Sequence, residues 1–151
     1  MLPSRSGIPE GLRVLPDGSW RAGDESVTHP ATLLYLKAHL VFDEEGAWVT
    51  DGHDRVRVAL DGPPLVVLSL TIDPLRGEAR VQLDDGSEEL LRDGSISMHE
   101  PSGRFEYTAR AGNARAAFSR SAHQTLLDHV EQVEGGEFIL RAGRRGITLR
   151  A

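Results

Sequence analysis

Residues 104–120 read RFEYTARAGNARAAFSR, and this stretch has the pattern of a β-hairpin. Gly112 and Asn113 stand at its centre, and both residue types tolerate the positive φ that a tight turn requires. With a two-residue turn there, the apolar residues of both arms share one face, namely Phe105, Tyr107, Ala109, Ala114, Ala116 and Phe118. The stretch therefore predicts two antiparallel strands with one buried face.

The same register predicts where the charged side chains of this hairpin lie. It puts Arg110 directly opposite Arg115. Like charges at facing positions disfavour the pairing unless negative charge relieves them. Two adjacent guanidinium groups suit a phosphate or a carboxylate, so we expect an anion site here. The alternative is that both side chains extend into water or pair with carboxylates of the chain itself.

Other strand-like runs extend through the chain and are separated by turn signals such as Asp51-Gly52 and Asp85-Gly86. Residues 55–60 alternate between arginine and apolar side chains, as a half-buried strand requires. Residues 65–72 carry apolar side chains toward both faces. We expect them to form a central strand that is covered on both sides.

Two segments have helical periodicity instead. The first covers residues 29–40, with Thr28 as the expected N-cap and Pro30 in the first turn. The second covers residues 122–132, with Ser121 as the expected N-cap. Residues 26–34 align without gaps with residues 119–127, and a similar hairpin pattern follows each segment. This indicates a duplicated helix-plus-hairpin unit, the alternative being chance similarity between short amphipathic segments.

These patterns together predict an α+β fold, mainly antiparallel sheet with two short helices. We expect an N-terminal α+β unit over residues 12–83 and a C-terminal β-rich unit over residues 84–151, ending in a helix and a hairpin. A chain of 151 residues is long enough for two small units.

The charge of the chain bears on its partners. Lys and Arg number 17 against 23 Asp and Glu, so the net charge is −6, which argues against a general binder of nucleic-acid polymers. The last third is nevertheless basic: residues 104–151 hold 8 basic and 5 acidic groups, whereas residues 1–103 hold 9 and 18. An anion should therefore prefer the last third.

Motifs for catalysis and for cofactors do not stand out. There is no cysteine, the histidines lack the spacing that directs two imidazoles at one metal ion, and no Gly-x-Ser-x-Gly or phosphate-loop pattern occurs. The carboxylate pairs, such as Glu88-Glu89, read as solvated loops. We therefore expect a protein without enzymatic activity, metal or cofactor. No apolar run is long enough to span a membrane, so a cytoplasmic location is the expectation.

Several short motifs resemble a known family. They are Asp17-Gly18-Ser19-Trp20, Val27-Thr28-His29-Pro30-Ala31, Trp48-Val49-Thr50, Arg55-Val56-Arg57-Val58, Pro64-Leu65-Val66 and residues 107–117. The pattern resembles an uncharacterised bacterial family called domain of unknown function twelve-eighty-five. The resemblance implies two related α+β units, a C-terminal one similar to pleckstrin-homology-like barrels, and a nucleotide-type ligand held between them in a signalling role.

Our hypothesis from the sequence is a binding or sensor module for a small anionic, nucleotide-like ligand at the interface of the two units. Arg110 and Arg115 would supply the charge, Asn113 and Arg120 would orient the ligand, and His53 and Arg55 of the first unit would close the site. The alternative is a protein-protein interaction module without a small ligand, whose partner is another protein or a second copy in a homodimer.

Overall fold

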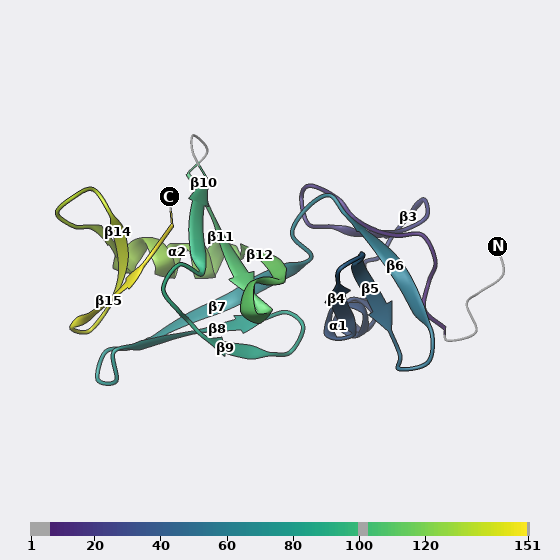
Figure 1. The fold of residues 1–151 in the computed structure, drawn as a ribbon, viewed down its shortest axis with the longest axis horizontal. Helices are drawn as coiled ribbons and strands as arrows, with labels where there is room; N and C mark the ends of the chain where they lie inside the picture. The colour runs from purple at the N-terminus through teal and green to yellow at the C-terminus, as the bar shows by residue number, and fades with distance from the viewer. Residues whose placement is uncertain (1–6, 100–102, 151) are drawn as a thin grey trace. The chain divides into compact units, whose positions relative to one another are not determined.

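The structure is a computed structural model that describes residues 7–99 and 103–150 (Figure 1). Contacts divide the chain into two compact units, Met1–Leu65 and Val66–Ala151. This division differs from the one predicted between residues 83 and 84. The reason is the long strand β7 (Leu65–Asp73), which pairs with β8 (Glu78–Leu83) and neighbours a strand from much later in the chain, so β8 and all of β7 except Leu65 belong to the second unit.

The first unit holds one six-stranded sheet with the order β3-β2-β1-β6-β5-β4 and one helix. Strands β1 and β6 are parallel, and the other pairs are antiparallel. The elements are β1 (Leu12–Val14), β2 (Trp20–Ala22), β3 (Glu25–Ser26), α1 (Pro30–Ala38), β4 (Leu40–Asp43), β5 (Gly46–Thr50) and β6 (Arg55–Leu60).

The core of the first unit is built around Trp20, which is 1% exposed. Its indole N–H donates to the backbone oxygen of Pro64 at 3.0 Å, so the one polar atom of this large ring is satisfied. Leu36 of α1 belongs to the same buried cluster as Val14 and Val49 of the sheet. The helix is therefore held by apolar packing against the sheet, as a helix of nine residues requires.

Helix α1 is shorter than the sequence predicted. It begins at Pro30, because proline has no N–H to lose in the first turn, and its N-cap is His29 rather than Thr28. It ends at Ala38, because Leu40 already pairs with Val49 in the sheet. The predicted strand over residues 55–60 is confirmed as β6.

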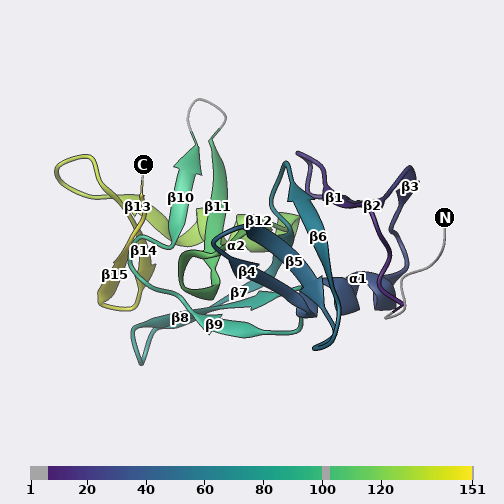
Figure 2. The same ribbon diagram turned by 45° about the vertical axis from the view of Figure 1, so that its right-hand side comes forward.

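The second unit holds a six-stranded sheet of order β10-β11-β12-β7-β8-β9, a three-stranded sheet of order β13-β14-β15, and one α-helix. Besides β7 and β8, its elements are β9 (Glu88–Leu90), β10 (Ile96–His99), β11 (Arg104–Ala109), the short 3-10 turn η1 (Arg110–Gly112), β12 (Ala114–Phe118), α2 (Arg120–His129), β13 (Val130–Gln132), β14 (Phe138–Ala142) and β15 (Arg145–Thr148). The β10–β11 end of the larger sheet turns steeply away from its β8–β9 end, which makes it a curled half-barrel (Figures 1 and 2).

The predicted central strand is confirmed, because β7 lies between β12 and β8. Leu65, Val67 and Leu70 are buried, but Leu68 is 45% exposed. The pairing with β8 shifts between Val67 and Ser69, and this irregularity breaks the strict alternation that the sequence pattern assumed. Val67 and Leu70 lie opposite Leu83 and Val81, which share the buried face of β8, so only one face of β7 is buried and the predicted coverage of both faces is wrong.

Helix α2 begins earlier than predicted. Its N-cap is Ser119, whose hydroxyl accepts from the backbone N–H of Ala122 at 3.2 Å, whereas Ser121 lies inside the first turn. The helix ends at His129, and the three strands β13–β15 follow it directly. In the first unit, α1 is followed by the three strands β4–β6 in the same way. The α+β class and the repeated helix-plus-hairpin arrangement are thus both present.

The last residues of the second unit lie beside strand β10. The backbone N–H of Arg150 donates to Ile96 at 2.8 Å, and the backbone oxygen of Arg150 accepts from Met98 at 3.0 Å. Ser97 and Arg150 form a parallel bridge. No helix within residues 7–99 and 103–150 is long and apolar enough to cross a membrane.

Candidate functional site

The hairpin of β11 and β12 turns earlier than the sequence predicted. Ala109 pairs with Ala114, and Arg115 lies opposite Thr108 rather than opposite Arg110. Arg110 and Ala111 form the turn together with Gly112, and their φ angles of 52° and 55° lie in the left-handed region. The predicted facing pair of guanidinium groups is therefore wrong.

Each of these two arginines is paired with a carboxylate of the second unit. The Arg110 guanidinium is 2.7 Å from Asp85, whose side chain is 4% exposed. The Arg115 guanidinium makes two hydrogen bonds to Glu106, of 2.5 and 2.9 Å, from the diagonal position on the neighbouring strand. The bond to Glu106 raises the pKa of Arg115. Neither pair leaves the open double cation that the sequence hypothesis needed.

Asp85 is ionised in spite of its burial. Desolvation opposes the charge, but hydrogen bonds from the Ser87 hydroxyl and from the Arg110 guanidinium outweigh it, and the pKa of Asp85 lies below its usual value. The carboxylate thus fixes the side chain of Arg110 and helps to explain why this residue leaves the strand ladder.

The other predicted site residues lie apart from a common group. Asn113 follows the turn and donates its side-chain N–H to the backbone oxygen of Arg110 at 3.1 Å. Arg120 is exposed at the first position of α2.

His53 and Arg55 belong to the first unit. His53 is exposed in the turn after β5, where its backbone N–H donates to Asp51. Arg55 donates to Asp43 at 3.0 Å and stacks on Trp48, with its guanidinium carbon 4.0 Å from the ring centroid.

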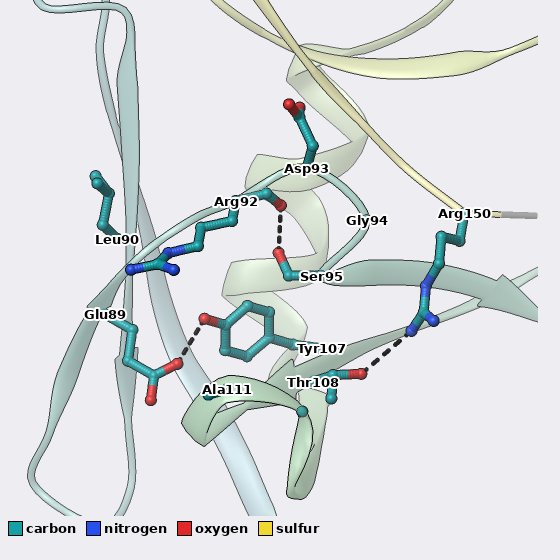
Figure 3. A pocket seen from close by; sticks show the side chains of 11 residues that line it. Glu89, Leu90, Arg92, Asp93, Gly94, Ser95, Tyr107, Thr108, Ala111 and Arg150 are labelled. Atoms are coloured by element: carbon teal, nitrogen blue, oxygen red, sulfur yellow. Dashed lines mark hydrogen bonds between the residues drawn. The ribbon is translucent and has the colours of Figure 1, made fainter.

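A cavity of about 540 Å³ lies within the second unit (Figure 3). Its walls come from strand β9, from the segment between β9 and β10, from strand β11, from the turn η1 and from Arg150. The lining residues are Glu89, Leu90, Arg92, Asp93, Gly94, Ser95, Tyr107, Thr108, Ala111, Gly112 and Arg150. This volume is typical of cavities that take small organic molecules.

Tyr107 and Glu89 form the polar wall on one side of the cavity. The Tyr107 hydroxyl donates to Glu89 at 2.6 Å, and the other carboxylate oxygen accepts from the backbone N–H of Arg110 at 3.0 Å. Burial and the bond to Glu89 raise the pKa of Tyr107, so its hydroxyl stays protonated. The Glu89 carboxylate therefore ties strand β9 to the strained turn.

The segment after β9 is held to the last strand of the chain. Gly94 donates its backbone N–H to Thr148 at 2.8 Å, and the backbone N–H of Thr148 donates to Asp93 at 2.9 Å. The hydroxyl of Ser95 donates to the backbone oxygen of Arg92 at 2.6 Å. These bonds fix the backbone from which Arg92 projects.

Two arginines bring positive charge to the cavity. Arg150 donates to the Thr108 hydroxyl at 3.4 Å, and Arg92 lies on the Glu89 side of the Tyr107 ring (Figure 3). Among the residues that the structure describes, neither guanidinium forms an ion pair within 4.0 Å. They are thus available to a ligand, unlike Arg110 and Arg115.

The sequence patterns did not indicate this group of residues. Glu88 and Glu89 read as a solvated pair, whereas Glu89 lies on strand β9 with both oxygens bonded. Arg150 reaches the cavity because it pairs with Ser97 of β10, and a local sequence pattern cannot predict a contact between segments so far apart. Within residues 7–99 and 103–150, no group of three or more His, Asp or Glu side chains is placed to hold a metal ion.

Comparison with solved structures finds proteins with a similar fold. No family model matches the sequence, and no curated protein matches it either. A DUF1285 family protein from Silicibacter pomeroyi superposes with a TM-score of 0.73 at 19% identity, over 95% of this chain and 81% of that one. A second DUF1285 family protein, from Shewanella baltica, gives a TM-score of 0.59 at 11% identity, over 78% of this chain and 90% of that one. The resemblance to the family of domain of unknown function twelve-eighty-five is thereby confirmed at the level of the fold.

Proposed function

We propose that this protein is a binding or sensor module, without enzymatic activity, for a small anionic ligand held in the cavity of its second unit. One observation carries the proposal: the guanidinium groups of Arg92 and Arg150 lie at the cavity without an ion-pair partner among the described residues. Guanidinium groups bind carboxylates and phosphates through charge-assisted hydrogen bonds. The ligand site thus moves from the predicted arginine pair to this cavity.

The surrounding structure supports a site that is formed before the ligand arrives. Backbone hydrogen bonds to Thr148 hold the segment that carries Arg92, and the pairing with β10 holds the backbone of Arg150. A preformed site binds more tightly because little ordering remains to be done on binding. A role in signalling and a cytoplasmic location are part of the same proposal, in which the protein reports the level of its ligand.

The test is thermal shift and titration calorimetry with acetate, glutamate, citrate, inorganic phosphate and AMP. We expect at least one of these anions to raise the melting temperature, since a ligand that binds only the folded state stabilises it. Arg92→Gln and Arg150→Gln should each weaken the binding by about tenfold or more, as expected when a charged hydrogen bond is lost.

The matched control is Arg144→Gln, which removes the same charge from an exposed residue outside the cavity. Its affinity should equal that of the wild type. Absence of binding by every anion, or equal affinity in all three variants, refutes the proposal.

The alternative function is a protein-protein interaction module. The first unit offers exposed apolar side chains, with Leu34 at 48%, Val41 at 42% and Tyr35 at 39% exposure. Single exposed apolar residues are ordinary on protein surfaces, so this observation is the weaker one. Light scattering at increasing concentration tests for a homodimer, which is the simplest form of this alternative.

A further inference from the structure

The side chain of Leu75 is 98% exposed, the largest exposure among the large apolar side chains that the structure describes. Leu75 lies in the turn 74–77 between β7 and β8. The Asp73 carboxylate accepts from the backbone N–H groups of Leu75 and of Arg76, each at 3.2 Å. The turn is therefore held in a defined shape that presents an apolar side chain to solvent, where it gains nothing from burial.

This turn packs against a second turn from much later in the chain, which consists of Gly143 and Arg144 between β14 and β15. A Cβ on Gly143 would lie 2.2 Å from the backbone oxygen of Pro74, so the two turns are in backbone contact. Figures 1 and 2 show the β7–β8 turn and the β14–β15 turn side by side. We call residues 73–77 and 141–145 together the paired turns.

The paired turns carry an excess of positive charge. Their arginines are Arg76, Arg141, Arg144 and Arg145. Each carboxylate at this end has an arginine partner: Asp73 lies 3.9 Å from Arg76, Glu131 of β13 pairs with Arg141, and Glu78, which follows the first turn, lies 3.8 Å from Arg80. Arg144 and Arg145 are exposed, and neither forms an ion pair within 4.0 Å among the residues that the structure describes. Two guanidinium groups thus lie beside Leu75 without a counter-charge.

The size of this surface indicates the kind of partner that it fits. Protein interfaces of ordinary size bury about 800 Å² on each side around an apolar core. The other large apolar side chains described as exposed in the second unit are Leu68, Leu90 and Leu127, and all of them lie outside the paired turns. A lipid surface requires no such core, because one inserted apolar side chain and nearby arginines each add to the affinity.

We infer that the paired turns bind reversibly to an anionic lipid surface, into which Leu75 inserts while Arg144 and Arg145 contact the lipid phosphates. This surface is separate from the cavity, because none of the cavity-lining residues belongs to the paired turns. The net charge of the whole chain is −6, so the attraction to anionic lipid is local and acts over about one Debye length. The binding is therefore weak and sensitive to salt.

The experiment is co-sedimentation of the full chain with lipid vesicles. One set contains phosphatidylglycerol and phosphatidylcholine in equal parts, and the other contains phosphatidylcholine alone. We expect binding to the first set to be about tenfold or more tighter than to the second, and to weaken as salt is added. On the first set, Leu75→Gln should bind about tenfold more weakly than the wild type, and Arg145→Gln about fivefold more weakly.

Two matched variants serve as controls. Leu34→Gln removes a leucine that is 48% exposed on α1, and Arg120→Gln removes an exposed arginine at the first position of α2. Both controls should bind the vesicles as the wild type does. Circular dichroism should show an unchanged fold in every variant, because all four substituted side chains are exposed.

A direct measurement of insertion is also possible, because the chain has no cysteine. Leu75→Cys gives a single attachment point for a polarity-sensitive fluorophore. We expect the emission of this label to shift to shorter wavelength with the phosphatidylglycerol vesicles. The same label on Leu34→Cys should show no shift.

The outcomes that overturn the inference are distinct from those that bear on the cavity. The inference is overturned if the protein does not bind the phosphatidylglycerol vesicles, if it binds both sets of vesicles equally, or if Leu75→Gln and Arg145→Gln bind as tightly as the wild type. Self-association in light scattering that Leu75→Gln abolishes, without vesicle binding, also overturns it and assigns the paired turns to a protein contact. None of these results changes the proposed function, which depends on Arg92 and Arg150.

Discussion

Replacing Ala111 by glycine should stabilise the second unit, although it removes a side-chain atom. Ala111 has φ 55° and ψ 35°, in the left-handed region. An L-residue pays about 1–2 kcal/mol for this conformation. Glycine avoids that cost but loses about 0.5–1 kcal/mol more backbone entropy on folding than alanine does. Ala111 is exposed, so little burial is lost. The expected net gain in the free energy of unfolding is about 0.5–1 kcal/mol.

The assay for Ala111→Gly must report on the second unit. Both tryptophans, Trp20 and Trp48, belong to the first unit, so their fluorescence in urea serves as an internal control that should not change. Thermal unfolding followed by far-ultraviolet circular dichroism reports on the whole chain. For a unit of this size, the expected gain corresponds to a rise of about 2–8 °C in its melting temperature. The reverse change, Gly112→Ala at φ 100°, should destabilise the same unit.

Whether Ala111→Gly raises or lowers the free energy of unfolding distinguishes the observed turn at residues 110–112 from the predicted turn at residues 112 and 113. If the turn consisted of Gly112 and Asn113 alone, Ala111 would lie in an extended strand, and glycine there would cost about 0.5–1 kcal/mol. A loss of stability in Ala111→Gly therefore refutes the left-handed turn, and with it the cavity wall that this turn forms.

Two further predictions concern the stability of the second unit. Asp85→Asn should cost about 3 kcal/mol at pH 7, because it breaks the ion pair between the Arg110 guanidinium and a carboxylate that is only 4% exposed. Because the pKa of Asp85 is lowered in the folded state, its ion pair stabilises the fold fully above the unfolded pKa near 4 and progressively less as the pH falls further. Urea unfolding should therefore show the free energies of unfolding of the wild type and of Asp85→Asn converging below about pH 4. A difference between them that stays constant down to about pH 3 argues against the ion pair. Gly143→Ala would place a Cβ 2.2 Å from the backbone oxygen of Pro74, whereas Gly135→Ala, also at positive φ, meets nothing within 4 Å. In urea unfolding, the first variant should be less stable than the second by about 2 kcal/mol or more, and equal stabilities contradict the steric account.

The hairpin of β11 and β12 shows what alternation along the chain can and cannot predict. Tyr107, Ala109, Ala114 and Ala116 are buried, as the pattern predicted. The observed register nevertheless differs from the predicted one by two residues, because a slip of two keeps every side chain on its face. The observed register is the one in which Arg110 bonds to Asp85 and Glu89, which lie far away in the sequence.

The first residue of helix α2 also could not be predicted from the local sequence. Ser119 and Ser121 are both good N-cap residues, and the local pattern gives no preference between them. Ser119 is selected in the fold because its backbone N–H donates to Val67 and its hydroxyl bonds to Leu68 and Ala122. Strand β7, which the apolar pattern did predict, thus fixes the start of α2.

The candidate site could not be predicted, because its members come together only through the sheet. Glu89 meets Tyr107 across the curled larger sheet, and Arg150 arrives from the last residues of the chain. The basic character of the last third of the sequence directed attention to Arg110 and Arg115. Both of those are neutralised by Asp85 and Glu106.

The bridge between Ser97 and Arg150 has a practical consequence for work with this protein. A purification tag placed after Arg150 would follow a cavity-lining arginine directly, and a polyhistidine sequence there would bring extra imidazoles and a flexible chain beside the cavity. A tag placed before the first unit is attached to the other unit. Expression vectors for the binding measurements should therefore carry their affinity handle at the front of the gene, with a protease site for its removal.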